Sequence, residues 1–119
     1  MLKGNNDVVK VTGITCAQEK AIKQFLQGAV YAWCNVNKNK SFHFRDLLGG
    51  DNFFWPGTPL SCLFDKYMSN DKDEEAALEK ASKDAVMLLK SLLIIDQYKT
   101  FDQEKVAGNG FENIWFWLA

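Results

Sequence analysis

Histidine, cysteine and proline are scarce in this chain of 119 residues, which contains one, three and two of them. The three cysteines cannot all pair, and no two have the spacing of zinc ligands, so we expect neither a disulfide framework nor a metal site. Free cysteine is commonly buried as a small apolar side chain, and we expect that role for Cys34 and Cys62. His43 is the single histidine, and the sequence around the possible cysteine nucleophiles matches no thiol-hydrolase pattern. The sequence therefore predicts no enzyme and no cofactor.

Long apolar runs are also absent. Apolar runs such as Leu92 to Ile95 fall far short of the ~20 residues that a membrane-spanning helix needs. The N-terminal residues 1–7 lack the apolar stretch of a secretion signal. We therefore expect a cytoplasmic protein with no membrane segment. A chain of this length forms one domain and buries about two-thirds of its unfolded surface, so it needs no covalent staples.

Arginine is nearly absent, because Arg45 stands alone among thirteen lysines. The charge is also uneven: residues 1–45 carry a net charge of +5 and residues 46–119 carry −6. Bidentate arginine is the commonest specific contact with base edges, so its scarcity argues against reading of a DNA sequence. Binding of phosphates through the basic N-terminal part stays open.

A strong helical pattern covers residues 16–36. Thr15 and Gln18 form a capping box, in which each side chain bonds to the other residue's backbone N–H. Apolar residues follow at helical spacing and define one face, made of Ile22, Phe25, Leu26, Ala29, Val30 and Trp33. Asparagines between residues 35 and 39 end the predicted helix.

Short elements are predicted after this helix. Alternating side chains favour a strand at 41–45, and Asp46 then caps a single helical turn that contains Leu47 and Leu48. The loop at 51–57 holds three adjacent aromatic residues, Phe53, Phe54 and Trp55. We expect this loop to fold back onto the core, with a ligand or partner site as the alternative.

Two further helices are predicted before the C-terminal third. Thr58-Pro59 is a typical helix start, and that helix ends near Asn70. Acidic residues between 71 and 75 suit the positive end of the next helix, which spans about 74–96. A possible cap at 82–84 leaves open whether that segment is one helix or two.

The C-terminal third predicts a β-hairpin. Strands at 98–106 and 111–118 flank a Gly-Asn-Gly turn at 108–110. A four-residue loop pairs Phe101 with Phe116, and a two-residue turn shifts the pairs by two, so both registers give the same faces. One face, expected to meet the core, carries Phe101, Ile114, Phe116 and Leu118; the other carries Asp102, Glu104, Trp115 and Trp117.

Residues 1–13 are expected to be a flexible segment, or a short strand at Val8, Val9 and Val11, before a single domain at 14–119. From residue 16 to 118 the order of helix, short strand, helices and hairpin resembles the winged helix-turn-helix superfamily. In this resemblance, residues 42–48 correspond to the first strand and short helix of the superfamily. Residues 88–95 correspond to the helix that precedes the wing, which is the hairpin at 99–118. The resemblance implies an α+β domain that is mostly helical and winged-helix-like. Members of that superfamily commonly bind DNA, and many have become protein-contact modules.

The second face of the hairpin predicts a function. Tryptophan is enriched at the energetic centres of interfaces, so Trp115 and Trp117 would anchor a contact. Lys99, Lys105 and Glu112 would form its rim. The alternative is that another part of the same chain covers the two indoles. The leading hypothesis is therefore a non-catalytic binding module that contacts a partner protein, or forms a homodimer, through the hairpin.

The second hypothesis is a winged-helix DNA-binding regulator. It would place lysines of the N-terminal half and the wing on phosphates, namely Lys20, Lys23, Lys38, Lys40, Arg45, Lys99 and Lys105. A recognition helix needs a polar, basic face, whereas residues 83–96 are apolar nearly all round. For this reason DNA binding ranks behind protein binding.

Overall fold

The computed structural model describes residues 1–4, 7–37, 40–48, 55–69, 73–105 and 113–118. Side chains at 104, 105, 113, 114 and 116–118 lie outside that description. Helices make up most of the described chain, and short strands form one antiparallel sheet. The order is α1 (Cys16–Val36), β1 (Ser41–Phe42), α2 (Phe44–Leu47), α3 (Ser61–Met68), α4 (Glu74–Ile95), β2 (Thr100–Lys105) and β3 (Asn113–Leu118).

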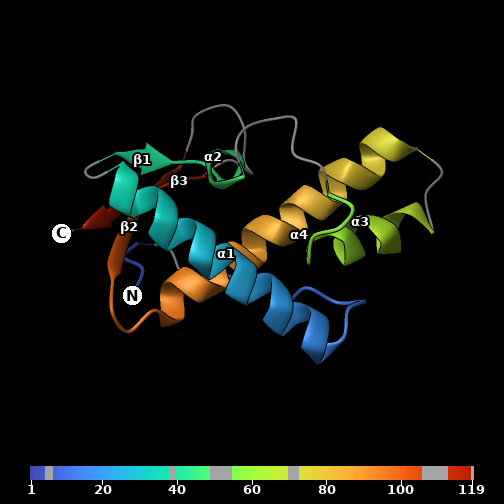
Figure 1. Ribbon diagram of the computed structural model, residues 1–119, viewed down its shortest axis with the longest axis horizontal. Coiled ribbons are helices and arrows are strands. Elements are labelled where there is room, and N and C mark those ends of the chain that lie inside the picture. The colour runs from blue at the N-terminus through green and yellow to red at the C-terminus, as the bar shows by residue number, and fades with distance from the viewer. Residues whose placement is uncertain (5–6, 38–39, 49–54, 70–72, 106–112, 119) are drawn as a thin grey trace.

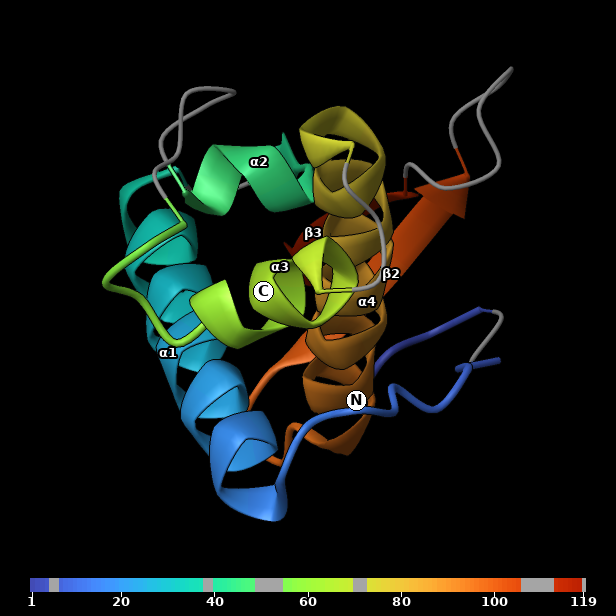
Figure 2. The ribbon, with the colours of Figure 1, turned by 90° about the vertical axis from the view of Figure 1, so that its right-hand side faces the viewer.

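The two long helices, α1 and α4, cross like the strokes of an X in the view of Figure 1. The sheet lies at the left end of the X, with β1 above the C-terminal end of α1 and β2 in the left opening, while α2 lies in the top opening and α3 in the right opening. Figure 2 shows α2 and α3 at different heights beside the two long helices, with α3 packed along α4 and α2 beside α1. No helix or strand that the structure describes lies in the bottom opening, between the start of α1 and the end of α4.

Helix α1 has the bounds that its sequence predicts. The Thr15 hydroxyl accepts a hydrogen bond from the Gln18 N–H at 3.1 Å, and the Gln18 side chain accepts one from the Thr15 N–H at 2.9 Å. This reciprocal cap satisfies two N–H groups that would otherwise have no partner. Four residues at every fourth position are buried, namely Ile22, Leu26, Val30 and Cys34. The predicted apolar face is thus confirmed.

Helix α4 is continuous, which resolves the alternative that the sequence left open at 82–84. Asp73 caps it through a bond from the Glu75 N–H at 3.1 Å. Its buried face carries Ala77, Ala81, Ala85, Leu88, Leu89, Leu92 and Leu93. Small residues in the first half allow α3 to approach closely, and leucines in the second half fill the wider space beside α1.

Two short elements differ from their predicted bounds. The strand expected at 41–45 ends at Phe42, because the Asp46 carboxylate accepts a bond from the His43 N–H at 2.8 Å and starts α2 one turn earlier. Helix α3 begins at Ser61, a few residues after the start at Thr58-Pro59 that the sequence predicts. The Thr58 hydroxyl instead donates to the Trp55 carbonyl at 2.8 Å, which closes a turn before the helix. Trp55 is buried, so the aromatic loop meets the core at this residue, while Phe53 and Phe54 lie outside the described residues.

The hairpin pairs in a register that the sequence analysis missed, so the faces predicted for β3 are wrong, whereas Phe101 of β2 is buried as predicted. Phe101 lies opposite Trp117 and Gln103 lies opposite Trp115, one residue away from either predicted pairing. A shift of one residue relative to β2 moves every side chain of β3 to the other face. Phe101 and Trp115 are therefore on the core side, where Trp115 is only 1% exposed.

The reason for this register is the position of β3 in the sheet. The strand order is β1-β3-β2, so β3 is central and pairs with β1 as well as with its hairpin partner. The Phe42–Trp115 pair joins β1 to β3, with ring centroids 6.0 Å apart, and the Phe42 ring also packs on Trp33 of α1 at 5.3 Å. An indole at the centre of the sheet buries more apolar area than the smaller residues predicted for that face.

The N-terminal segment also differs from expectation. The structure assigns no strand to residues 7–12, and Val9 is exposed. Instead, Leu2 makes a parallel bridge with Phe101, which donates to the Met1 carbonyl at 2.7 Å and accepts from the Lys3 N–H at 2.8 Å. Leu2 is buried by this contact. The segment thus extends the free edge of β2.

Replacement of Trp115 by serine is expected to lower the free energy of unfolding by about 3–5 kcal/mol, because a large buried side chain is lost and a cavity remains. Urea unfolding followed by circular dichroism measures the change. Val36→Ser is the control, since Val36 is 83% exposed and its loss should cost no more than about 0.5 kcal/mol. Equal unfolding midpoints for the two variants would contradict the buried placement of Trp115.

Candidate protein-binding groove

A groove of about 460 Å³ occupies the bottom opening between α1 and the end of α4. One wall is the N-terminal half of α1, and the other is the last turn of α4 with the residues that follow it. Its lining consists of Cys16, Glu19, Lys20, Lys23, Gln24, Gln27, Leu92, Ile95, Asp96, Gln97 and Tyr98. We call this the α1–α4 groove. Leu92 is buried beneath it, so its base is apolar while its α1 wall is polar.

Two large side chains stand exposed at this groove. Ile95 is 68% exposed and Tyr98 is 84% exposed, although the preceding Leu93 is fully buried. Isolated apolar residues on a surface are ordinary, but two that share one groove form a patch. Tyrosine adds a hydroxyl to a broad apolar ring, which is why it is enriched at interfaces.

The turn that carries Tyr98 is held in place by Asp96. One carboxylate oxygen, Oδ1, accepts the N–H groups of Tyr98 and Lys99, both at 2.8 Å. The other, Oδ2, accepts the Tyr31 hydroxyl of α1 at 2.5 Å. The Met1 ammonium group donates to the Asp96 carbonyl at 2.5 Å and to the Lys99 carbonyl at 2.7 Å. The end of α4, the start of β2 and α1 are thus joined around one carboxylate.

These contacts also determine the protonation of Asp96. Burial disfavours the charged carboxylate, but the hydrogen bonds from Tyr31, Lys99 and Tyr98, together with the Met1 ammonium, outweigh burial and hold the pKa of Asp96 below its ordinary value. The pKa of Tyr31 is raised, first by burial and then by its bond to Asp96. The carboxylate is therefore charged and the phenol neutral at neutral pH, as this hydrogen bond requires.

The free charge on the α1 wall is positive. Lys23 lies 3.7 Å from Glu19, one turn earlier on the same helix, which is a weak, solvent-exposed pair. Lys20 is exposed and makes no ion pair with a residue that the structure describes. The N-terminal end of α1, at Cys16, adds the partial positive charge of unpaired N–H groups. The groove thus combines an apolar anchor pair with a basic wall.

The predicted partner-binding residues lie elsewhere or outside the described parts. Trp115 is sealed in the core and cannot anchor a contact, so its predicted exposure is wrong. Glu112 and the side chains of Lys105 and Trp117 are outside the described residues. Lys99 is partly exposed and follows Tyr98 directly, so it is the one predicted rim residue that the structure places near the groove.

The predicted phosphate-binding residues do not form one patch. Lys20 and Lys23 line the groove, whereas Lys40 and Arg45 are exposed beyond the opposite end of α1. The 21 residues of this helix span about 30 Å at ~1.5 Å per residue. Lys38 lies outside the described residues.

The sequence analysis missed Ile95 and Tyr98. It assigned the first to an apolar helix and the second to the start of a strand. A signal was available in the polar pair Asp96-Gln97 between them, because an aspartate after a helix commonly bonds to backbone N–H groups two and three residues ahead.

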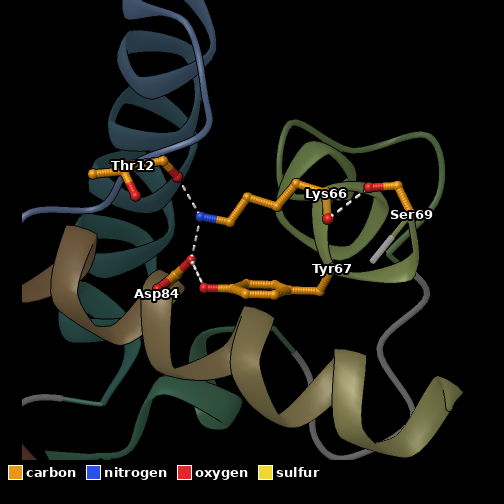
Figure 3. A network of polar contacts seen from close by, with 5 residues as sticks. All are labelled: Thr12, Lys66, Tyr67, Ser69 and Asp84. Atoms are coloured by element: carbon orange, nitrogen blue, oxygen red, sulfur yellow. Dashed lines mark hydrogen bonds and ion pairs between the residues drawn. The ribbon is translucent and has the colours of Figure 1, made fainter. Parts of the chain in front are cut away.

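A second polar cluster joins Lys66 and Tyr67 of α3 to Asp84 of α4 (Figure 3). Asp84 Oδ2 lies 2.6 Å from Lys66 Nζ and accepts the Tyr67 hydroxyl at 2.7 Å. Lys66 Nζ also donates to the Thr12 carbonyl of the N-terminal segment. Burial, and then the bond to Asp84, raises the pKa of Tyr67 to about 12. A phenol with a raised pKa is not a base at neutral pH, and the bonds of this cluster fasten α3, α4 and the N-terminal segment to one another.

The cysteines and the histidine show no activated pair. Burial raises the pKa of the Cys34 thiol to about 11, and burial also raises that of Cys62, which is the opposite of a reactive thiolate. The His43 Nδ1 atom is buried with no hydrogen-bond partner among the described residues, as is the Trp115 indole nitrogen. The described chain has no group of three or more residues arranged to hold a metal ion.

Comparison with protein-family models, with curated proteins and with solved structures finds no match for this chain. Within the ranges that the structure covers, no helix combines the length and the apolar character that crossing a membrane requires.

Replacement of Asp96 by asparagine is expected to lower the free energy of unfolding by about 1–3 kcal/mol at neutral pH, because an amide cannot accept all the bonds that the carboxylate accepts. A carboxylate with a lowered pKa contributes stability that is present above its unfolded-state pKa and is lost as the pH falls through its folded-state pKa. The difference between the wild type and Asp96→Asn should therefore shrink as the pH falls below about 4.

Urea unfolding of both proteins from neutral to acidic pH measures this difference. Tyr31→Phe is the matched control, because it removes one bond to the carboxylate and leaves its charge in place. It should cost less than Asp96→Asn at neutral pH. A stability difference that stays constant down to low pH would show that the Asp96 charge is not the stabilising element.

Proposed function

We propose that this chain is a non-catalytic binding module that contacts another protein through the α1–α4 groove. The observation that carries the proposal is the pair Ile95 and Tyr98, which stand exposed at a groove and are positioned by the hydrogen bonds of Asp96. This proposal keeps the class of function expected from the sequence and moves its surface from the hairpin to the groove between α1 and the end of α4.

The energetics of the anchor pair support protein binding. Full burial of an apolar side chain of this size contributes about 1.5–3 kcal/mol relative to exposure. Binding normally loses part of that gain to the ordering of mobile side chains and loops. The Asp96 turn is already ordered by bonds to Tyr31 and to the backbone, so the cost of fixing Tyr98 is lowered.

The charge of the groove defines the kind of protein segment it fits. Lys20 and Lys23 favour carboxylates, and the apolar base and rim favour an aliphatic or aromatic side chain. A segment that carries both, at a spacing of one helical turn, would satisfy the two walls at once. We therefore infer an acidic, amphipathic partner segment.

The winged-helix-like arrangement remains part of the proposal. It is supported by the order helix, short strand, helices and hairpin, and by the pairing of β1 with the second strand of the hairpin. In that arrangement α4 takes the place of the recognition helix. Its leucine-rich second half is buried, which favours protein contact over insertion into a DNA groove.

Replacement of Ile95 and Tyr98 by serine is expected to abolish binding of acidic peptides and leave the fold intact, since both side chains are exposed. The measurement is selection of a displayed random-peptide library on the wild type, followed by binding of the enriched peptides to both proteins. Enriched peptides should contain acidic and apolar residues and bind the variant at least tenfold more weakly.

Val9→Ser with Val36→Ser is the matched control, because it removes two exposed apolar side chains away from the groove and should leave peptide binding unchanged. Peptides that bind wild type and the groove variant equally would overturn the proposal. A labelled DNA duplex at low salt tests the alternative: retardation that disappears with added salt and with Lys20→Glu would favour a phosphate-binding function.

A further inference from the structure

The start of α4 carries an acidic surface, whereas the groove at its other end is bordered by two lysines of α1. At its start, Glu74 and Glu75 are exposed, and neither makes an ion pair with a residue that the structure describes. Leu78 is four residues after Glu74 and three after Glu75, so it lies on the same face of the helix. Its side chain is 39% exposed. This acidic turn combines carboxylates with one exposed aliphatic side chain.

The α1–α4 groove at the other end of α4 has the complementary character. Lys20 and Lys23 supply cations, while Ile95 and Tyr98 supply exposed apolar surface. The acidic turn therefore has the chemistry that the groove is inferred to bind: carboxylates and an aliphatic group within one helical turn. The chain itself contains a ligand of the right class.

The two surfaces of one molecule cannot meet. Helix α4 has 22 residues and spans about 33 Å at ~1.5 Å per residue, and its ends lie at opposite sides of the molecule (Figure 1). Contact between the acidic turn and a groove must therefore join different copies of the chain. Because the two surfaces differ, such a contact is head to tail, and every open assembly keeps one unoccupied groove at one end and one unoccupied acidic turn at the other.

We propose that copies of this chain associate head to tail, with the acidic turn of one seated in the α1–α4 groove of the next. This inference rests on the proposed function of the groove and names a second copy as its occupant. Glu74 and Glu75 of one copy face Lys20 and Lys23 of its neighbour, and Leu78 covers the exposed Ile95 and Tyr98.

The expected association is weak and sensitive to salt. One helical turn in a groove is a small contact beside the ~1,200–2,000 Å² that stable interfaces bury. Charges on solvent-exposed side chains are screened over about 8–10 Å at ordinary ionic strength. The weight-average mass should therefore rise above the monomer mass of 13.5 kDa at high protein concentration and low salt, and return to it as salt is added.

Charge reversal tests the proposal sharply. In the first variant Lys20 and Lys23 are replaced by glutamate, and in the second Glu74 and Glu75 are replaced by lysine. Each variant alone presents like charges at both surfaces and should remain monomeric in light scattering. A mixture of the two restores opposite charges at every contact and should regain the mass increase of the wild type.

The matched control is Lys40→Glu with Arg45→Glu, which makes the same change in charge beyond the far end of α1 and should associate like the wild type. Circular dichroism verifies that every variant is folded; the single variants Lys20→Glu and Glu74→Lys replace any that is not. A wild type that stays at the monomer mass at every concentration, or a mixture that fails to regain the increase, overturns the inference. Selected peptides that still bind the groove in that case would preserve the proposed function, because they show an occupant other than a second copy.

Discussion

The crossing of α1 and α4 is the constraint on which the rest of the structure depends. Two long helices that cross at an angle pack closely only near the crossing point, where the stripe from Ile22 to Cys34 meets the leucines of α4. Away from that point the helices diverge and leave openings. Helices α2 and α3 lie in the top and right openings, the sheet covers the left end, and the groove occupies the bottom opening.

The hairpin illustrates how a sequence can predict an element and miss its orientation. Helix α1 was predictable to the residue because the capping box and the apolar stripe are local signals within one segment. The face of β3 was not, because it depends on pairing with β1, which lies more than 70 residues earlier in the chain. All four residues at 115–118 are large and apolar, so either face could be buried, and the pairing of Trp115 with Phe42 selects one.

The groove could not be predicted for a related reason. Its walls come from the first turns of α1 and the end of α4, and nothing in either segment indicates that the two helices cross. The apolar run before Asp96 suggests burial throughout, yet Leu93 is buried and Ile95 is exposed, since the end of α4 passes beyond the packed part of α1. The sequence identifies Lys20 as a charged residue on the polar side of its helix, but it does not show that Ile95 and Tyr98 lie across a groove from it.

The bond between Tyr31 and Asp96 has a consequence for selectivity. It joins the C-terminal half of α1, one turn beyond the groove lining at Gln27, directly to the residue that follows α4, so the two helices that form the groove walls are tied together next to the groove. A tie of this kind limits how far the two helices can separate. In the proposed binding mode, shape would therefore select the occupant of the groove before charge does, and removal of the tie would relax that selection.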